Sequence, residues 1–390
     1  MKHLFLFAAL LLFACSRPAA PGDGVRRIRV DAGRVEALRL EEWFSEVSYV
    51  PLSDDLLIGT VERAKVRDGK LLVLADGDVS VFDVDSGRAL LRVSHEGAGP
   101  GEYVSLSDML YDSEADAVEV LDRNGRKVLR YGMDGRFAGE VRLPFSPFAF
   151  RRVAPSRYLF YNNNMVSEAT DCRLVLYDAE ASEVVGAYFP VDRHLATYFF
   201  VLDAGNFGSG TNVSFHFAAS DTVYGFTDAC VPRPKYVIDF GAHRVPPRFY
   251  GEDYEDIRDF SERAARNGYI YMYGNFQEEG NVAAFSFHRD GEVYWVLYDS
   301  ELGTATVVNR WTDGADAGAE VGIAHGNGPF ALDDGYMYFF LPPDQLIELA
   351  ERADGAGVRV NGALNRIRDA YGFSEESNPV LVKCRLKFKI

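Results

Sequence analysis

The stretch VFDVDSGRALLRV, which begins at Val81, combines an apolar strand-like run with an aromatic residue, a polar turn and a second apolar run. The pattern recurs as LRYGMDGRFAGEV from Leu129, LVLYDAEASEVVGAY from Leu174, TVYGFTDACVPRPKYVIDF from Thr222 and WVLYDSELGTATVV from Trp295. The aromatic residues that mark the copies are 49, 46, 47 and 74 residues apart: Phe82, Tyr131, Tyr177, Tyr224 and Tyr298. Such a period is typical of a β-propeller with one four-stranded blade per repeat, and the longest gap then holds one blade and an insertion.

The strand-like runs predict an all-β ring, a six-bladed β-propeller. Blades one to five are expected over about 59–94, 103–143, 147–190, 197–240 and 268–311, and blade six from about 321. Residues 241–268 predict a helical crossing segment, and Pro342-Pro343 opens a short helical insertion in the last blade, about 342–376. Because a closed ring leaves few open edges, we expect residues 25–52 to supply a strand to the C-terminal blade.

The charge of the chain limits its partners. The 390 residues carry a net charge of −17, from 41 basic and 58 acidic side chains. Nucleic acids and anionic membrane surfaces need a Lys or Arg for each phosphate contact, so this balance argues against them. The 28 Phe and 21 Tyr residues fit the spaces between twisted blades. We therefore expect a monomeric propeller with no nucleic-acid partner.

The first residues predict export and a lipid tether. A basic start, Met1-Lys2-His3, precedes ten apolar residues, 4–13, which are too few to cross a hydrocarbon core of about 30 Å. The following Leu-x-Ala-Cys ending resembles a bacterial lipobox, which implies lipidation of Cys15. The division is then 1–14 signal peptide, 15–24 lipidated tether and 25–390 propeller. Ser16 favours the outer membrane, periplasmic or surface-facing, and a simple secretory signal is the alternative.

The spacing of His and Cys residues contains no metal-binding motif. H-x-H, HExxH and CxxC patterns are all absent from the sequence. The six histidines that follow the signal fall in different blades: His95, His194, His216, His243, His288 and His325. We therefore expect no cofactor, with a divalent cation in the axial channel left open. A Cys172–Cys230 disulfide is also left open, since both cysteines lie near expected turns.

The segment EGAGPGEY, from Glu96 to Tyr103, resembles the G-x-G-P-G-E/Q-[FY] signature of NHL-type propellers. Its glycines permit a tight crossover between blades, and Tyr103 would anchor the next blade. Three further segments are FSEVSYVPL from Phe44, PKYVIDFG from Pro234 and NPVLV from Asn378. Together they resemble the six-bladed β-propeller lipoprotein family of Gram-negative gut anaerobes, related to NHL and TolB-type propellers. The resemblance implies a fold and the cell envelope as compartment, but not a reaction.

Two groups of residues are candidates for ligand binding. Asp122 and Arg123 lie in LDRNGRK, which resembles the NHL-type stretch that ends an inner strand, and this places them near a channel mouth. Tyr161 and Asn163 belong to a set of rings and amides suited to a sugar: Tyr158, Tyr161, Asn162, Asn163, Asn164, Tyr269, Tyr271, Tyr273, Asn275 and Phe276. Turn bracing for the first pair and packing between blades for the second group are the competing interpretations.

These observations favour a membrane-tethered, non-catalytic propeller that binds a glycan, peptide or envelope protein at its channel mouth or rim. A nutrient-uptake system would suit such a protein. The alternative is a metal-dependent lyase or hydrolase at the axial channel, an activity that some NHL-type propellers have. A third interpretation is a scaffold for an envelope complex. The sequence contains no G-x-S-x-G elbow or P-loop, and propellers host many unrelated activities.

Overall fold

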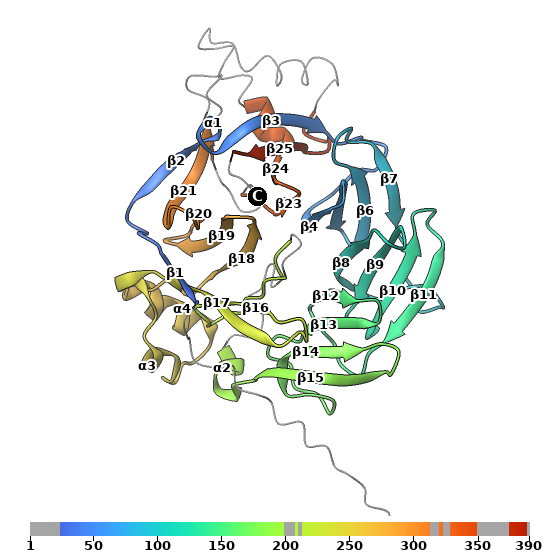
Figure 1. The fold of residues 1–390 in the computed structure, drawn as a ribbon, viewed down its shortest axis with the longest axis horizontal. Coiled ribbons are helices and arrows are strands. Elements are labelled where there is room, and N and C mark those ends of the chain that lie inside the picture. Colours follow the sequence, from blue (N-terminus) through green and yellow to red (C-terminus); the bar gives the residue numbers. More distant parts are fainter. Residues whose placement is uncertain are drawn as a thin grey trace, which may run out of the picture.

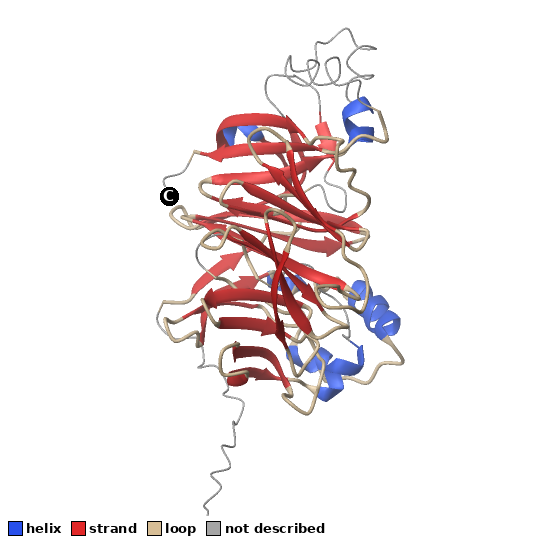
Figure 2. Cartoon of the chain, turned by 90° about the vertical axis from the view of Figure 1, so that its right-hand side faces the viewer, coloured by secondary structure: helices blue, strands red, loops and turns tan. Residues whose placement is uncertain are grey.

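The computed structural model describes residues 24–198, 207–209, 213–312, 320–322, 328–348 and 374–387. Their strands form six sheets that stand as blades around a central axis (Figure 1). Most of the helices lie on one side of the ring (Figure 2). The prediction of an all-β, six-bladed propeller is confirmed.

Blades one to three are each built from one continuous segment of four antiparallel strands, ordered from the axis outward. Blade one consists of β4 (Val61–Arg67), β5 (Lys70–Ala75), β6 (Asp78–Asp83) and β7 (Ala89–Val93). Blade two consists of β8 (Leu106–Asp112), β9 (Ala117–Asp122), β10 (Lys127–Gly132) and β11 (Phe137–Arg142). Blade three consists of β12 (Ala149–Ala154), β13 (Arg157–Tyr161), β14 (Cys172–Asp178) and β15 (Glu183–Pro190).

Blades four to six combine C-terminal strands with strands from the start of the described chain. Blade four contains bridges that join Phe207, Phe215 and Tyr224, then β16 (Thr222–Phe226), β17 (Pro232–Asp239) and β1 (Arg26–Arg29). Blade five contains β18 (Tyr273–Glu279), β19 (Val282–Arg289), β20 (Glu292–Asp299), β21 (Thr304–Thr312) and β2 (Val35–Arg39), and β22 (Glu320–Gly322) pairs with β21. Blade six contains β23 (Ala331–Asp333), β24 (Tyr336–Leu341), β25 (Val380–Leu386) and β3 (Phe44–Pro51).

The N-terminal segment closes the ring, but over three blades rather than one. As expected, β3 pairs with β25 of the last blade. The strands β1 and β2 of the same segment pair in parallel with β17 and β21, at the outer edges of blades four and five. Burial accounts for these pairings, because Ile28 is 0% exposed between blades four and five and Leu38 is 2% exposed between blades five and six. The helix α1 (Leu40–Trp43) then leads the chain into β3.

Tight Asp-Gly turns join several strands. The φ angles are 50° and 80° at Asp76 and Gly77, a conformation that short polar residues and glycine adopt readily. The predicted turn at Gly135 also has a positive φ, of 79°. At the predicted Asn124-Gly125 turn, however, the positive φ of 51° falls on Arg126. Gly125 is needed there for space, since an added Cβ would lie 2.0 Å from an Asp122 carboxylate oxygen.

The EGAGPGEY segment forms the expected crossover between blades one and two. The N–H of Gly97 donates to the carbonyl of Tyr103 at 2.8 Å, and the N–H of Tyr103 donates to the carbonyl of His95 at 2.9 Å. The Tyr103 ring is buried, and its hydroxyl donates to Asp78 at 3.0 Å. The anchoring role predicted for Tyr103 is confirmed.

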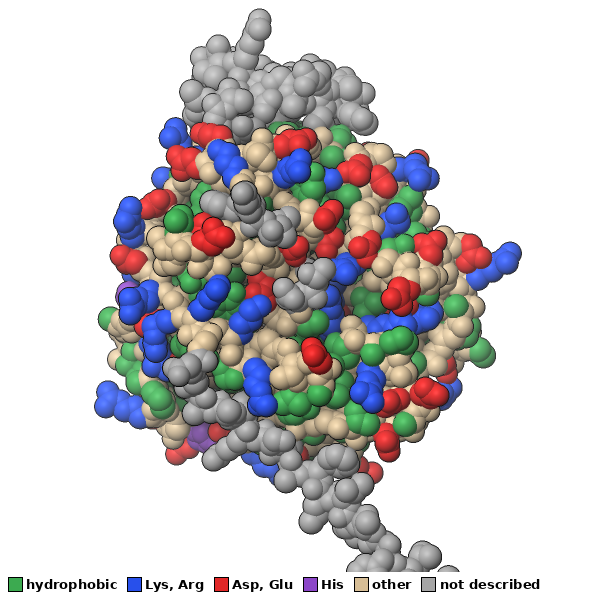
Figure 3. All heavy atoms as spheres, in the orientation of Figure 1, with side chains coloured by type: hydrophobic (Ala, Val, Ile, Leu, Met, Phe, Trp, Pro, Cys, Tyr) green, Lys and Arg blue, Asp and Glu red, His purple; other side chains and the backbone are tan. Residues whose placement is uncertain are grey.

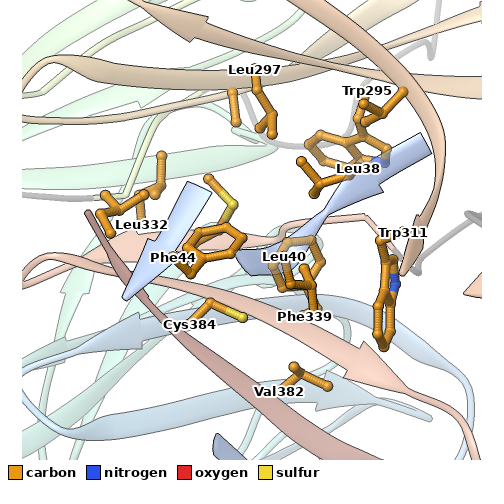
Figure 4. Packing of buried hydrophobic residues seen from close by; sticks show 14 of the residues in the cluster. Leu38, Leu40, Phe44, Trp295, Leu297, Trp311, Leu332, Phe339, Val382 and Cys384 are labelled. Carbon is orange, nitrogen blue, oxygen red and sulfur yellow. The ribbon is translucent and has the colours of Figure 1, made fainter. Parts of the chain in front are cut away.

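Hydrophobic clusters fill the spaces between neighbouring blades, with one cluster at each of the six blade interfaces. Between blades five and six, Trp295, Trp311 and Phe339 pack with Leu38 and Phe44 of the N-terminal segment (Figure 4). Full burial of such side chains contributes about 1.5–3 kcal/mol each. The five aromatic residues that mark the sequence repeats are all buried in these clusters: Phe82, Tyr131, Tyr177, Tyr224 and Tyr298.

Helices occupy the crossing segment predicted between blades four and five. They are η1 (Gly241–His243), α3 (Pro247–Tyr250) and α4 (Ile257–Arg266), whereas α2 (Arg193–Tyr198) lies between blades three and four. The N-cap Asp256 accepts hydrogen bonds from the N–H groups of Arg258 and Asp259. Phe260 of α4 packs on Phe249 of α3. Among the described residues, no helix combines the length and apolarity needed to cross a membrane.

Some predictions fall partly outside the described residues. In blade six a helix begins at residue 343 and is described to residue 348, so the start of the predicted insertion is confirmed. Most of the remaining insertion, with the second predicted helix, lies outside the described residues, as do the signal peptide, Cys15 and His325. Cys230 is a free cysteine, so a Cys172–Cys230 disulfide is not formed.

Candidate functional site

The candidate site is a cavity of about 1050 Å³ on the propeller axis, lined by the innermost strands β4, β8, β12 and β18 and by residues before β23. Lys and Arg side chains gather around a hollow to the right of the centre in Figure 3, where Figure 1 places β4 and β12. A cavity of this size is large enough for an organic ligand. Its lining differs between the two halves of the ring.

A row of cations lies on the innermost strand of blade one. Arg63, Lys65 and Arg67 alternate with Ala64 and Val66 along β4, so strand geometry places the three cations on one face. All three side chains line the cavity, and they are only 18%, 22% and 31% exposed to solvent. Such partly buried cations lose much of their hydration and need nearby negative charge.

Asp108 on β8 is the nearest negative charge to the row. Its side chain is fully buried, and one carboxylate oxygen lies 2.7 Å from Lys65 Nζ and 3.6 Å from Arg63 Nε. The other oxygen accepts a hydrogen bond of 2.9 Å from the Phe150 N–H on β12. One carboxylate therefore connects the inner strands of blades one, two and three.

Asp333 on β23 meets the other end of the row. Its carboxylate lies 3.4 Å from an Arg67 guanidinium nitrogen and accepts from the N–H of Asp68 at 3.2 Å. Burial raises the pKa of Asp333, although the positive charge of Arg67 opposes this rise. Arg67 has a second acidic partner, because a carboxylate oxygen of Asp68 lies 3.2 Å from its Nε.

Arg151 on β12 adds a fourth cation to the cavity lining. Its pKa is lowered to about 10, mainly by burial and then by the charge of Arg67, while Asp333 and Asp108 oppose the shift. The pKa of Lys65 is lowered to about 8 by burial, with Arg63 and Arg151 adding to the effect and Asp108 opposing it. For both groups the neighbouring cations add to the larger effect of burial. Clustered, perturbed groups of this kind are typical of functional sites.

A second charged network, between blades two and three, is balanced by contrast. Arg130 Nε donates to Glu119 at 3.0 Å, and Arg130 also lies 3.3 Å from Asp112. Arg152 pairs with Asp112, and the Tyr158 hydroxyl donates to Glu119 at 3.0 Å. Two guanidinium groups thus face two carboxylates. This network holds the two blades together and leaves no excess charge.

The other half of the cavity wall is neutral. Ser209 lies in blade four, and its N–H donates to Gln277 Oε1 at 2.5 Å. The Gln277 amide donates to Asn275 Oδ1 at 3.2 Å. Together with His288 and Trp295, these side chains offer amide, hydroxyl and aromatic surface to a ligand. Asn275 is the member of the predicted sugar-binding set that the structure brings into the cavity.

Asp122 and Arg123 are not brought into the axial cavity. The fully buried Asp122 carboxylate accepts hydrogen bonds from the N–H groups of Val104, Ser105 and Gly125, at 3.0, 3.1 and 2.8 Å. The Arg123 guanidinium stacks over the Phe148 ring at 3.7 Å. These contacts match the turn-bracing alternative. A ligand-binding role for the pair stays a prediction.

Tyr161 and Asn163 are also outside the cavity lining. Both are buried, and the Tyr161 hydroxyl donates to Asn163 Oδ1 at 3.1 Å. The Tyr161 ring packs edge-on against Phe215 in the core between blades three and four. Tyr269 and Tyr271, two further members of the predicted set, precede β18 and pack around α4. The binding role of Tyr161 and Asn163 stays a prediction, with packing as their observed contact.

The histidines are dispersed through the described structure. His288 lines the cavity, whereas His95 stacks on Tyr131 and His216 hydrogen-bonds the carbonyl of Ser220 at 2.8 Å. His194 and His243 bind backbone carbonyls of the crossing segment. No group of three or more His, Cys, Asp or Glu side chains suited to a metal ion occurs in the described part of the chain. The lyase or hydrolase alternative therefore gains no ligand set from these residues.

Sequence reasoning missed the cationic row. The run VERAKVR, from Val61 to Arg67, contains the signal, because basic residues at every second position share one face of a strand. Period two alone does not tell whether that face meets water or a cavity. The partners Asp108, Arg151 and Asp333 come from three other inner strands, so their proximity is set by the ring.

The fold and the cavity define the class of protein: a six-bladed β-propeller with partly buried cations on its axis. The family model described as "Domain of unknown function (DUF4934)" matches residues 26–385. The chain belongs to this family. Among curated proteins, none matches the sequence.

The chain is similar to several solved structures. A protein of Bacteroides fragilis NCTC 9343 named "putative exported protein" has a TM-score of 0.71 and 19% identity, over 93% of this chain and 100% of that chain. At this identity the likeness shows the fold alone. A DUF4221 family member from Bacteroides vulgatus has a TM-score of 0.49 and 10% identity, over 87% of this chain and 96% of that chain. Virginiamycin B lyase from Staphylococcus aureus has a TM-score of 0.38 and 11% identity, over 75% and 81% of the two chains. Neither of these two likenesses supports a functional argument.

Proposed function

We propose that this protein is a non-catalytic, envelope-tethered binding protein that holds part of a glycan, peptide or protein partner in its axial cavity. The cavity of about 1050 Å³ carries the proposal, because it brings charged, amide and aromatic groups from different blades to one place. A rigid ring suits binding, since side chains on packed strands are already positioned before the ligand arrives.

The tether is the second part of the proposal. Lipidation at Cys15 would hold the propeller at the outer membrane, with residues 15–24 as a flexible connection. The Bacteroides fragilis protein of similar fold carries a name that describes it as exported, which agrees with this location. In a Gram-negative host, the full chain should fractionate with membranes and incorporate labelled palmitate. Cys15→Ser should abolish both, and unchanged membrane association would overturn the tether.

The binding role is tested with the full chain, purified in detergent, on glycan and peptide arrays. A cavity-blocked variant, Ala154→Trp, is compared with Ala138→Trp on the exposed outer strand β11. Binding that is lost in Ala154→Trp and kept in Ala138→Trp supports the axial site. Equal binding by both variants places the ligand elsewhere. A folded wild-type protein that binds no glycan, peptide or envelope protein overturns the proposed function.

A further inference from the structure

Lys65 is the lysine that a molecule in the axial cavity meets. Among the described residues, it is the one lysine that lines the cavity, and its side chain is 22% exposed. Its Nζ lies 2.7 Å from a carboxylate oxygen of Asp108. Lys127 and Lys235 also lie near carboxylates, at 3.5 and 2.6 Å, but both are outside the cavity lining. Lys65 therefore combines a paired amine with access to the cavity.

Asp108 lies behind this amine, since its side chain is fully buried and does not line the cavity. One of its carboxylate oxygens is held by the Phe150 N–H at 2.9 Å. The other oxygen faces Lys65 and lies 3.6 Å from Arg63 Nε, and it forms no further hydrogen bond within the described structure. This oxygen is free to take a proton from the amine and to return it.

The surroundings of Lys65 increase its neutral form, which is the nucleophilic one. The pKa of Lys65 is lowered to about 8, mainly by burial, with Arg63 and Arg151 adding to the effect and Asp108 opposing it. An amine of this pKa is about one quarter neutral at pH 7.5, against about 0.1% for an ordinary lysine. The supply of reactive amine is therefore about 200-fold larger.

An amine beside a carboxylate and open to a cavity can form an imine with an aldehyde or ketone. The nitrogen lone pair attacks the carbonyl carbon, and the electrons of the C=O bond move to the oxygen. Asp108 takes a proton from the nitrogen and returns one to the resulting hydroxyl, which leaves as water while the C=N bond forms. Ammonium and carbonyl compound thus become iminium and water, with no oxidant, reductant or net proton consumed.

The contact between Lys65 and Asp108 survives this reaction. The iminium carries the same positive charge as the ammonium group that it replaces, so the buried carboxylate of Asp108 keeps its counter-charge. A buried carboxylate left without a partner would destabilise the fold strongly. Imine formation therefore adds a ligand to the cavity without breaking the pair that joins blades one and two.

We infer that Lys65 is a covalent capture site, which holds a small aldehyde or ketone in the axial cavity as an imine while Asp108 moves the proton. The cavity of about 1050 Å³ leaves room for an organic group beyond the carbonyl carbon. This covalent site goes beyond the proposed binding function, since it needs only that a small molecule enters the cavity.

Labelling with pyridoxal tests the site. The full chain, purified in detergent, is treated with pyridoxal and then with sodium borohydride, which reduces an imine to a stable amine, and peptide mass spectrometry locates the adducts. At pH 7.5, Lys65 should be labelled at least tenfold faster than Lys127, because more of its amine is neutral. Its rate should level off above about pH 8, whereas the rate at an ordinary lysine rises toward pH 10. A lysine with a purely structural role would show no such early plateau.

Two variants test the position of the amine. Lys65→Arg keeps a positive charge beside Asp108 but cannot form an imine, and Lys127→Arg is its control, at a side chain that is 13% exposed and outside the cavity. The fast labelling should disappear in Lys65→Arg and remain in Lys127→Arg. Should Lys65→Arg fail to fold, the cavity-blocked Ala154→Trp should still slow labelling of Lys65 about tenfold or more, with Lys127 unchanged.

Asp108→Asn tests the proton transfer. Loss of this negative charge would lower the pKa of Lys65 further, so a purely electrostatic role predicts faster labelling. A role in moving the proton predicts labelling at least tenfold slower instead, despite the larger neutral fraction. Faster labelling of Asp108→Asn would overturn the role given to Asp108.

Two results overturn the covalent site as a whole. One is labelling of Lys65 that is no faster than that of Lys127, and the other is labelling that Ala154→Trp leaves unchanged. The proposed binding function is decided separately. An array ligand that is lost in Ala154→Trp and kept in Ala138→Trp maintains axial binding even when Lys65 forms no imine.

Discussion

Blades one to three and blades four to six differ both in construction and in what they give the cavity. The first three are continuous four-stranded segments, whereas each of the other three takes a strand from residues 26–51 (Figure 1). The continuous half provides the cations of β4 and β12. The half that includes N-terminal strands provides neutral groups such as Asn275 and Trp295.

This difference separates the source of stability from the site of recognition. Strands β1, β2 and β3 lie at the outer ends of their sheets, far from the innermost strands that line the cavity. Changes in the N-terminal segment should therefore act on folding. Changes on β4 should act on ligand binding with little effect on folding.

Removal of the N-terminal strands should have the largest effect. Deleting residues 24–52 leaves strand edges of blades four, five and six uncovered and removes the Phe44 side of the core between blades five and six. We expect loss of the single cooperative unfolding transition in calorimetry, and a smaller loss when residues 24–31 alone are deleted. A shortened chain that melts at the wild-type temperature would contradict the closing role of these strands.

A matched pair of phenylalanines compares the two halves directly. Phe44 is 2% exposed between blades five and six, whereas Phe137 on the outer strand of blade two is 44% exposed. Phe44→Ala should lower the free energy of unfolding by about 3–5 kcal/mol, because it leaves a cavity in a packed core. Phe137→Ala should cost less than about 1 kcal/mol. Similar losses in urea unfolding would remove the distinction between the segments.

Acid should lower the free energy of unfolding through His216, which lies in blade four. Burial lowers the pKa of this blade-four histidine to about 4, against the opposing effects of the Ser220 carbonyl and Asp221, and its ring lies 5.2 Å from Tyr273. The unfolded chain takes up this proton near pH 6.5, so the contribution is complete above pH 6.5 and is lost as pH falls toward 4. The loss should reach about 3 kcal/mol.

Urea unfolding at several pH values tests this. His216→Gln should reduce the change in the free energy of unfolding between pH 6.5 and pH 4. His243→Gln, at a half-buried position where the histidine ring binds the Gly268 carbonyl, is the control and should retain the wild-type slope. If His216→Gln has the same slope as wild type, the acid sensitivity arises from other groups.

The cavity cations should give the smallest change in stability. Arg63→Gln removes one of the neighbouring cations, while Asp108 keeps Lys65 at 2.7 Å and the Phe150 N–H at 2.9 Å, so we expect a change of about 1 kcal/mol or less in the free energy of unfolding. Arg152→Gln, which breaks the pair with the buried Asp112, should cost clearly more. Thermal melts without ligand provide the comparison. A large loss in Arg63→Gln would give the row a structural role and argue against its role in recognition.

The repeat pattern predicted much of the fold because its information is local. Aromatic residues such as Tyr131 and Tyr177 recur at the blade period, and Asp-Gly pairs mark several turns. These features depend on residues close in sequence, so blade bounds and inter-blade packing could be inferred without a structure. The Tyr103 crossover was predictable for the same reason.

The site was harder to predict because its residues come from separate blades. The sequence placed Asp122 near the channel mouth, yet its carboxylate accepts hydrogen bonds from three backbone N–H groups of a turn and a crossover. Arg67 and Asp333 are far apart in sequence, and their contact exists through closure of the ring. The parallel pairing of β1 and β2 depended likewise on which blade edges were left uncovered.

The sequence by itself determined the six-bladed all-β ring, its blade order and the aromatic cores, because periodic burial follows from local strand and turn chemistry. Only the tertiary structure decided where the N-terminal strands lie, and that cations of blades one and three line one cavity and meet the buried carboxylates of Asp108 and Asp333. The physical reason is that a strand pattern states which residues share a face. Closure of the ring decides what that face meets.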